Sequence, residues 1–174
     1  MSGVTTRLRP VDTTDVGTRA IRPADLPALL VMNNAAVPNV NALDLDELAR
    51  LVKQARVAEA VLVAGAPRGF VLALPPRVDY DSPNYLWFTG RFDDFLYVDR
   101  IVVDDNQRGN GLGGVLYGVV IDQARRDNAP MVACEVNLQP PNPGSLRFHG
   151  RLGFVEVGQQ STGDKVVAML AKRL

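Results

Sequence analysis

The sequence predicts a single α/β (α+β) domain, in which about four helices flank a central mixed, twisted sheet of six or seven strands. Three observations support this fold class. The chain has 174 residues, of which 47% are hydrophobic, enough for one full core and too few for two ordinary domains. Strand-like and helix-like segments follow in the order strand, two helices, three strands, helix, strand, helix, two strands. Residues 95–137 form a strand–helix–strand unit, which implies two parallel strands.

The chain begins with an irregular segment. Residues 1–17 are rich in Thr and Asp and carry no periodicity, so we interpret them as an extension of a domain that spans residues 18–174. A short strand at 18–21 is followed by a helix at 22–37. Pro23 lies near the first turn of this helix, where a missing N–H is harmless.

A second helix is expected at residues 44–55. Asp44 and Glu47 have the spacing of a capping box, in which each side chain accepts a hydrogen bond from the other residue's main chain. The apolar stripe that should face the core consists of Leu45, Leu48, Leu51 and Val52.

Two β-rich runs and a long polar segment follow the helix pair. The runs at 58–66 and 69–75 are separated by Pro-Arg-Gly around 67–69, which predicts a hairpin there. Residues 76–94 carry no period and are expected to form a loop, and loops this long in compact domains are usually functional or disordered. Disorder is disfavoured by four aromatic residues, Tyr80, Tyr85, Trp87 and Phe88.

The C-terminal half supplies the parallel strands and a final strand pair. A strand at 95–103, a helix at 114–128 and a strand at 129–137 make up the parallel unit. The remaining elements are a short helix within 142–154 that ends at Gly153, and two antiparallel strands at 155–158 and 165–173.

The charge balance and the cysteine count exclude several classes of protein. Lys plus Arg and Asp plus Glu both number 19, so no net field attracts nucleic acid or an anionic membrane. A single cysteine, Cys134, allows neither a disulfide nor a zinc cluster of thiolates, and no metal site is expected. The sequence has no apolar run of about 18 residues and no apolar signal segment. These features predict a cytoplasmic protein without a nucleic-acid or membrane partner.

A glycine-rich loop is the strongest local motif. Residues 109–114 read G-x-G-x-x-G, and Glu135 follows about twenty residues later, as in dinucleotide-binding folds. In those folds, however, the glycines end the first strand of the sheet and several parallel units follow. Here a helix pair and a hairpin precede the loop, and residues 104–108 separate it from its strand.

Arg108 gives the same loop a second interpretation. The sequence RGNGLG is R-x-x-G-x-G, and it opens a helix. Successive main-chain N–H groups at a helix N-terminus bind anions, and glycines let a phosphate come close to the main chain. Arg108 can add a charge-assisted contact, so the loop is expected to bind a phosphate or pyrophosphate.

Two motifs together resemble those of the GNAT superfamily of acyltransferases. In the first, IVVDDNQRGNGLGGVLYGVVIDQAR at 101–125, a strand ending in Val precedes R-x-x-G-x-G and a long helix. In the second, NPGSLRFHGRLGF at 142–154, an Asn, a small residue and an aromatic pair lead to Leu-Gly-Phe. The motifs cover residues 96–157, and the element order extends the resemblance to about 18–174. The resemblance implies a GNAT-like domain with a splayed pair of parallel strands.

The resemblance also implies acetyl-CoA as co-substrate and gives positions to it. In the family, the strand before the glycine loop binds the pantetheine arm through its main chain, and the matching residues are Ile101, Val102 and Val103. The pyrophosphate is expected on the amides of Arg108, Gly109, Asn110, Gly111, Leu112 and Gly113. The positions that steady the thiol end match Asn142 and Ser145, and Asn142 also suits a helix N-cap.

The implied reaction is attack of a neutral amine on a thioester, which needs a group that accepts a proton. Glu135 and Asp99 are the candidate bases, since each lies on one of the two diverging strands. Glu135 interrupts an otherwise apolar run, where burial would raise its affinity for protons. A salt bridge from Glu135 to Arg100 or Arg147 is the alternative.

A proton donor would help the thiolate to leave, and a main-chain N–H near residue 102 is expected to stabilise the oxyanion. In many relatives the acid is a tyrosine at the second position of the aromatic pair, whereas this sequence has Phe148 followed by His149. An imidazole can donate a proton near neutral pH, so His149 is the candidate acid. The alternatives are that His149 packs in the core or faces solvent.

The segment 79–94 is expected to form a wall of the acceptor site, because carboxylates beside aromatic faces suit a cationic amine. The candidate substrate-binding residues are Tyr80, Tyr85, Trp87, Tyr97 and Asn33.

Three functions from different classes are therefore compared. The first is acetyl transfer from acetyl-CoA to the primary amine of a small molecule or amino-acid-like acceptor. The second is a non-catalytic acyl-CoA-binding module, since the usual acid is replaced. The third is a dinucleotide-dependent oxidoreductase. The sequence leaves open the acceptor, the acyl chain length and the oligomeric state, with a homodimer among the options.

Overall fold

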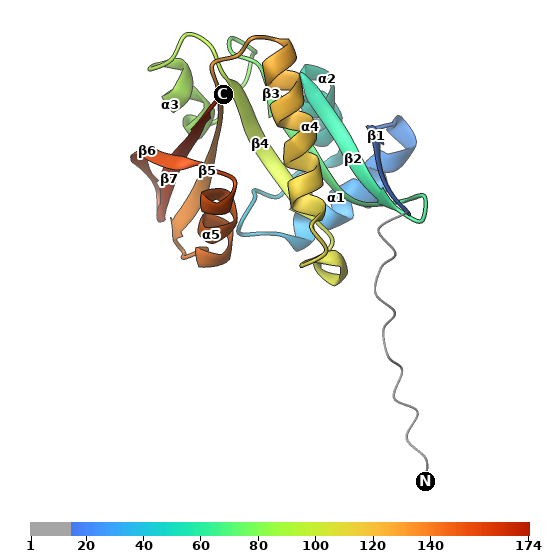
Figure 1. The fold of residues 1–174 in the computed structure, drawn as a ribbon. Helices are drawn as coiled ribbons and strands as arrows, with labels where there is room; N and C mark the ends of the chain where they lie inside the picture. The colour runs from blue at the N-terminus through green and yellow to red at the C-terminus, as the bar shows by residue number, and fades with distance from the viewer. Residues whose placement is uncertain (1–14) are drawn as a thin grey trace.

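A computed structural model describes residues 15–174 and shows one seven-stranded mixed sheet with helices on both faces (Figure 1). The strand order is β1-β2-β3-β4-β5-β7-β6. The strands are β1 (Val16–Ala20), β2 (Val57–Val63), β3 (Ala66–Leu74), β4 (Leu96–Val103), β5 (Met131–Gln139), β6 (Val155–Thr162) and β7 (Lys165–Arg173). The helices are α1 (Leu26–Ala35), α2 (Leu45–Gln54), α3 (Pro83–Thr89), α4 (Leu112–Arg126) and α5 (Pro143–Arg151). The predicted fold class is confirmed.

The two faces of the sheet carry separate hydrophobic clusters. On one face α4 lies across the strands, with α5 beside β5, while α1 and α2 lie behind the sheet in Figure 1. The α4 side is built on Leu116, Tyr117 and Val120, all fully buried. The opposite side is built on Leu29 and Phe88, among others, from α1 and α3. The sheet thus separates two environments that meet only where its strands part.

The start of α2 forms as the sequence predicts. The main-chain N–H of Glu47 donates to Asp44 Oδ1 at 2.8 Å, and that of Asp44 donates to Glu47 Oε2 at 2.8 Å. Leu48 and Leu51 are buried against the sheet. Leu45, however, is 45% exposed, so its inclusion in the apolar stripe was wrong. Leu45 is the first residue of α2 and lies outside the core that buries Leu48 and Leu51.

Two local predictions are corrected by the structure. The hairpin turns at Ala64 and Gly65, whose φ angles of 50° and 77° are left-handed, as a two-residue hairpin turn requires. The predicted turn residues 67–69 lie inside β3. The segment 76–94, predicted as a loop, contains α3, which is only seven residues long and begins at Pro83. A helix of two turns is too short to establish a period in the sequence.

The predicted N-terminal extension lies mostly outside the described residues, which begin at 15. β1 starts at Val16, two residues before the predicted domain start, and Val16 pairs with Val63 of β2. The division at residue 17 otherwise stays a prediction.

The parallel strands β4 and β5 diverge soon after they begin. Only two residue pairs join them, Leu96 with Val132 and Tyr97 with Ala133. Beyond these pairs β4 stays with β3 as far as Val103, and β5 stays with β7. Leu72 and Ala73 of β3 pair with Arg100 and Val98, so Asp99 is an extra, bulged residue of β4. The splayed pair implied by the sequence resemblance is therefore present, and a gap opens between its strands.

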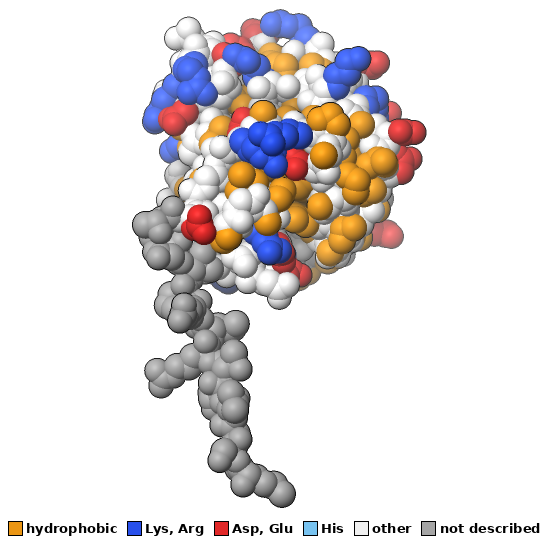
Figure 2. Space-filling model, turned by 90° about the vertical axis from the view of Figure 1, so that its right-hand side faces the viewer, with side chains coloured by type: hydrophobic (Ala, Val, Ile, Leu, Met, Phe, Trp, Pro, Cys, Tyr) orange, Lys and Arg blue, Asp and Glu red, His pale blue; other side chains and the backbone are white. Residues whose placement is uncertain are grey.

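Charges of both signs are scattered over the surface. Figure 2 shows Lys or Arg and Asp or Glu side chains interspersed on one face, with hydrophobic side chains gathered between them. This distribution agrees with the equal numbers of acidic and basic residues. No helix within residues 15–174 has the length and apolarity needed to cross a bilayer.

Gly69 gives a test of the sheet around the gap. A Cβ atom at this position would lie 2.7 Å from Val102 O and 3.2 Å from Val103 Cα, which are both main-chain atoms. We expect Gly69→Ala to lower the free energy of unfolding by about 1–3 kcal/mol, because the backbone of β4 must move. Gly17→Ala on β1, where a Cβ meets nothing within 4 Å, is the control and should change it by less than about 0.5 kcal/mol. Urea unfolding measures both, and equal effects would contradict the close packing of β3 on β4.

Candidate active site

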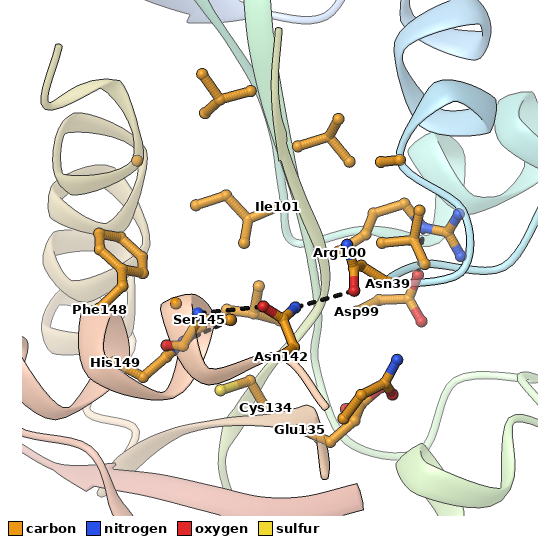
Figure 3. A pocket seen from close by; sticks show the side chains of 18 of the residues that line it. Asn39, Asp99, Arg100, Ile101, Cys134, Glu135, Asn142, Ser145, Phe148 and His149 are labelled. Atoms are coloured by element: carbon orange, nitrogen blue, oxygen red, sulfur yellow. Dashed lines mark hydrogen bonds and ion pairs between the residues drawn. The ribbon is translucent and has the colours of Figure 1, made fainter. Parts of the chain in front are cut away.

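A cavity of about 910 Å³ fills the gap between β4 and β5. Its walls come from both strands, the first turn of α3, the N-terminal half of α4, α5 along its length, the start of β7, and the loop at 36–44 between α1 and α2. Figure 3 shows side chains of α5 on one side of this space, and Asp99 and Arg100 of β4 on the other. The cavity thus reaches both faces of the sheet.

The glycine loop leads into the N-terminus of α4 at one end of the cavity. Gly109 and Gly111 have left-handed φ angles of 79° and 77°, and a Cβ atom on either would meet nothing within 4 Å. Gly111 is the N-cap residue and no side chain caps the helix, so its first N–H groups stay free for an anion. Arg108 stands beside them and pairs with Asp105 at 2.7 Å. The loop therefore has the geometry of a phosphate site.

Most of the predicted coenzyme residues line this cavity. Asn110 is the exception, and its side-chain amide donates to Gln107 Oε1 at 3.3 Å. Gly113 has a steric reason to be glycine, because a Cβ there would lie 2.9 Å from Phe148 Cζ. The predicted coenzyme residues that line the cavity are Ile101, Val102, Val103, Arg108, Gly109, Gly111, Leu112, Gly113, Asn142 and Ser145.

Asn142 joins α5 to the opposite wall of the cavity. Its Oδ1 accepts from the main-chain N–H of Ser145 at 3.3 Å, which is the predicted N-cap contact. Its Nδ2 donates to Asn39 Oδ1 at 3.1 Å across the gap, as Figure 3 shows. The N-cap role and a place beside a ligand in the gap are therefore compatible.

His149 is buried, with both ring nitrogens in hydrogen bonds. Nδ1 lies 2.8 Å from the main-chain oxygen of Ser145, which can only accept, so Nδ1 carries the hydrogen. Nε2 must then accept from the hydroxyl of Tyr117, 2.7 Å away. Burial lowers the pKa of His149 and raises that of Tyr117. The pair is therefore neutral, and His149 in this form has no proton directed at the cavity.

Glu135 projects from β5 into the cavity at the point where the strands part. Its Oε2 accepts from the Tyr97 hydroxyl at 2.7 Å, and its Oε1 accepts from Asn84 Nδ2 at 3.1 Å. Burial raises the pKa of the Glu135 carboxyl to about 7. The Asp99 carboxylate acts in the same direction, whereas the hydrogen bond from Tyr97 acts against it. Glu135 is thus a carboxylate that can take up or release a proton near neutral pH.

Asp99, the other predicted base, is held in a charged network on β4. Its Oδ2 accepts from Arg100 Nε at 2.7 Å, and its Oδ1 accepts from the Tyr80 hydroxyl at 2.6 Å. Arg100 Nη1 also donates to Asn33 Oδ1 at 2.8 Å, inside the core. Arg100 therefore pairs with Asp99, while Glu135 is held by neutral partners. Arg147, the other cation considered for Glu135, is exposed on α5.

The predicted acceptor residues divide into one that lines the cavity and four that support its walls. Tyr80 lines it. Tyr97 lies behind Glu135 and is fully buried, and Asn33 anchors Arg100. Tyr85 is buried and donates to Pro75 O at 2.8 Å, whereas Trp87 packs on Gly158, where a Cβ would lie 2.5 Å from its ring. These four reach the cavity only through other residues.

Several residues around the cavity were not predicted as site residues. Asn84 belongs to the unrecognised α3, although Ser82 before Pro83 is a helix-start signal. Tyr117 lies on a helix that was recognised, but nothing local marks it as the partner of His149. The unpredicted polar residues that line the cavity include Asn39, Asn84, Arg100, Tyr117, Asn137 and Lys165.

The sequence is similar to those of known acetyltransferases. The model of the acetyltransferase (GNAT) family matches residues 45–154. Over 143 residues the chain is 32% identical to the L-methionine sulfoximine/L-methionine sulfone acetyltransferases of Pseudomonas aeruginosa and Pseudomonas paraeruginosa, covering 78% of this chain and 78% of each of them.

Solved structures share the fold. Ard1 from Thermoplasma volcanium superposes with a TM-score of 0.75 at 16% identity, covering 92% of this chain and 98% of its own. The structure of yncA from Salmonella typhimurium, determined with acetyl-CoA, superposes with a TM-score of 0.69 at 19% identity, covering 91% and 94%. The dinucleotide interpretation receives no support from the sheet, in which β4 and β5 are the only parallel neighbours among the described strands.

The raised pKa of Glu135 predicts a pH-dependent stability. A carboxyl with a pKa of about 7 when folded and near 4.5 when unfolded binds its proton more tightly in the folded state. Stability therefore falls as the pH rises from about 4.5 to about 7, by at most about 3 kcal/mol. Glu135→Gln imitates the protonated form, so we expect it to raise Tm at pH 8 and to change Tm little at pH 5.

Thermal unfolding at the two pH values measures this effect. Glu156→Gln is the matched control, because Glu156 is exposed on β6. An increase in Tm that is the same at pH 5 and pH 8 would show that the effect does not come from the ionisation of Glu135.

Proposed function

This chain belongs to the acetyltransferase (GNAT) family, and on that premise we propose that it transfers the acetyl group of acetyl-CoA to the primary amine of a small, amino-acid-like acceptor. Acetyl-CoA is the co-substrate of the family. The single observation that carries the proposal is the Glu135 carboxylate, with a pKa of about 7, at the point where the cavity crosses from one face of the sheet to the other.

The residues present fit acetyl-CoA. The amides at 108–113 and the start of α4 would hold the pyrophosphate, since the left-handed glycines leave open space beside them. The main chain of β4 at 101–103 faces the gap and would bind the pantetheine arm. Asn142 and Ser145 would border the thiol end, on the α5 side. When bound, acetyl-CoA supplies the thioester that an amine can attack.

Glu135 would be the general base. An amine attacks only in its neutral form, so a proton must be removed from it. Glu135 Oε1 and Oε2 are oriented by Asn84 and Tyr97, which leave further lone pairs of the carboxylate free to accept that proton. Asp99 is committed to Arg100 and Tyr80, so its role would be to hold these two side chains in the wall of the site.

We propose a positioning role for His149. Because Nδ1 is bonded to Ser145 O and Nε2 accepts from Tyr117, the neutral ring holds α5 against α4 beside the thiol end. The proton that completes the departing thiol would then come from solvent, while the proton of the amine leaves through Glu135. Protons balance in this scheme without an acid in place of the family's tyrosine.

The acceptor class follows from the site together with a relative. Carboxylates at Glu135 and Asp99 beside the Tyr80 ring suit a cationic amine, which deprotonates before attack. The relatives that are 32% identical are named for L-methionine sulfoximine and L-methionine sulfone, both of which are amino acids. L-Methionine sulfone is therefore the first acceptor to test.

Release of the coenzyme thiol tests the base assignment. With L-methionine sulfone, we expect kcat/KM of the wild type to rise with pH through about 7, as Glu135 loses its proton. Glu135→Gln should lower kcat about 10²- to 10⁴-fold with an unchanged KM for acetyl-CoA. Arg108→Ala, at the other end of the cavity, should raise the KM for acetyl-CoA and leave kcat nearly unchanged. Normal turnover by Glu135→Gln would rule out Glu135 as the base.

A further inference from the structure

We propose that Lys165 binds the α-carboxylate of the acceptor and thereby makes the site selective for amino acids over simple amines. The inference rests on the proposed function and adds a specificity-determining residue to it. Lys165 is the first residue of β7 and lies beside the turn between β6 and β7. It lines the cavity and is partly buried.

Four cationic side chains line the cavity, and their surroundings differ. Arg108 pairs with Asp105 on the glycine loop, and Arg100 pairs with Asp99. Arg151 extends from α5, whose side chains pack with α4 on the coenzyme side of the sheet. Lys165 lies on the acceptor side, and its described partners are neutral oxygens: Asn41 Oδ1 at 3.2 Å and Pro38 O at 3.5 Å. Its charge is therefore available to an anionic group of the acceptor.

The register of β7 places Lys165 and Glu135 on the same face of the sheet. Met169 is the direct partner of Glu135 in the β5–β7 ladder, and Val167 is the partner of Asn137. Side chains alternate along a strand, so Lys165, Val167 and Met169 share one face with Glu135. Four residues of strand separate the Cα atoms of Lys165 and Met169 by about 13 Å. Both side chains line the same cavity, and this span leaves room between them for the head group of an α-amino acid.

This arrangement provides opposite charges for the two ends of that head group. The amine would lie at Glu135, where its proton is removed, and the carboxylate would lie at Lys165. A charge-assisted hydrogen bond from an ammonium to a carboxylate is among the stronger polar contacts in a protein. An acceptor without the carboxylate would lack this contact and would leave Lys165 bonded to Asn41 and Pro38.

Lys165 also contacts the loop at 36–44. A structural role in holding this loop is therefore the alternative to carboxylate binding. That loop has two other ties across the gap: Asn142 Nδ2 to Asn39 Oδ1 at 3.1 Å, and Asn137 Nδ2 to Pro38 O at 3.3 Å. Because these ties remain when Lys165 turns to a ligand, the loop does not depend on Lys165 alone.

The experiment compares two acceptors, L-methionine sulfone and its primary carboxamide, in which a neutral amide replaces the carboxylate. Thiol release is measured for the wild type, Lys165→Met, Lys165→Arg and Lys53→Met. Lys53 is exposed on α2, away from the cavity, and is the matched control. Each variant is compared with the wild type for the same acceptor, which cancels the different basicity of the two amines.

We expect Lys165→Met to lower kcat/KM for L-methionine sulfone about 10- to 100-fold, mainly through KM, since a hydrogen bond between charged groups is lost. For the carboxamide the change should stay within about 2-fold. Lys165→Arg should retain most of the activity with the acid, because it keeps the charge. Lys53→Met should behave as wild type with both acceptors.

Two results would overturn the inference in distinguishable ways. If Lys165→Met lowers kcat/KM for the acid and the carboxamide by the same factor, or lowers neither, Lys165 does not read the carboxylate, while amino-acid acetylation stands. If the wild type releases no thiol with either acceptor, the proposed acceptor class fails, and the role of Lys165 fails with it.

Discussion

Two residue pairs are all that join β4 to β5, and the rest of the site depends on this short ladder. Leu96 and Tyr97 pair with Val132 and Ala133, after which each strand follows its other neighbour. Main-chain groups that would bond across a closed sheet are thereby left facing a cavity, where a ligand can satisfy them. The divergence also connects the two faces of the sheet, which elsewhere are separate hydrophobic cores. In the proposed reaction, a coenzyme bound on the α4 side and an acceptor bound on the α3 side would meet at this opening.

Glu135 and Asp99 have different electrostatic environments in the opening between β4 and β5. Glu135 stands where the strands part, so its carboxylate is shielded from solvent and its pKa rises to about 7. Asp99, two positions beyond the last residue of β4 that pairs with β5, lies in the bulge and contacts Arg100 and Tyr80. The carboxylates of Glu135 and Asp99 are therefore held by different kinds of partner. Glu135, which has neutral partners, can exchange a proton, whereas Asp99 is held in an ion pair with Arg100.

The sequence predicted best what is encoded locally. The capping box at Asp44, the N-cap at Asn142 and the glycine loop depend on residues within a few positions of one another, and all three form. Glu135 was a candidate base in the sequence because a carboxylate inside an apolar run needs a reason to be there. The two-turn helix α3 and the turn at Ala64 and Gly65 were missed, because short elements leave little periodic signal.

The contacts that could not be predicted join residues that lie far apart in the sequence. The direction of Tyr85 and Trp87 depends on packing against Pro75 and Gly158, so aromatic character alone could not separate a pocket residue from a core residue. The partner of His149 is Tyr117, 32 residues earlier on another helix. Lys165 gains its position from the register of β7 against β5. These contacts exist only once the sheet is assembled.

A crystal structure with coenzyme A and N-acetyl-L-methionine sulfone would show where both products of the proposed reaction bind. We expect pantetheine density between β4 and β5, and the amide nitrogen of the product within about 3 Å of a Glu135 oxygen, or bridged to it by one water. Coenzyme bound outside the gap, or a product nitrogen on the far side of the cavity from Glu135, would contradict the proposal.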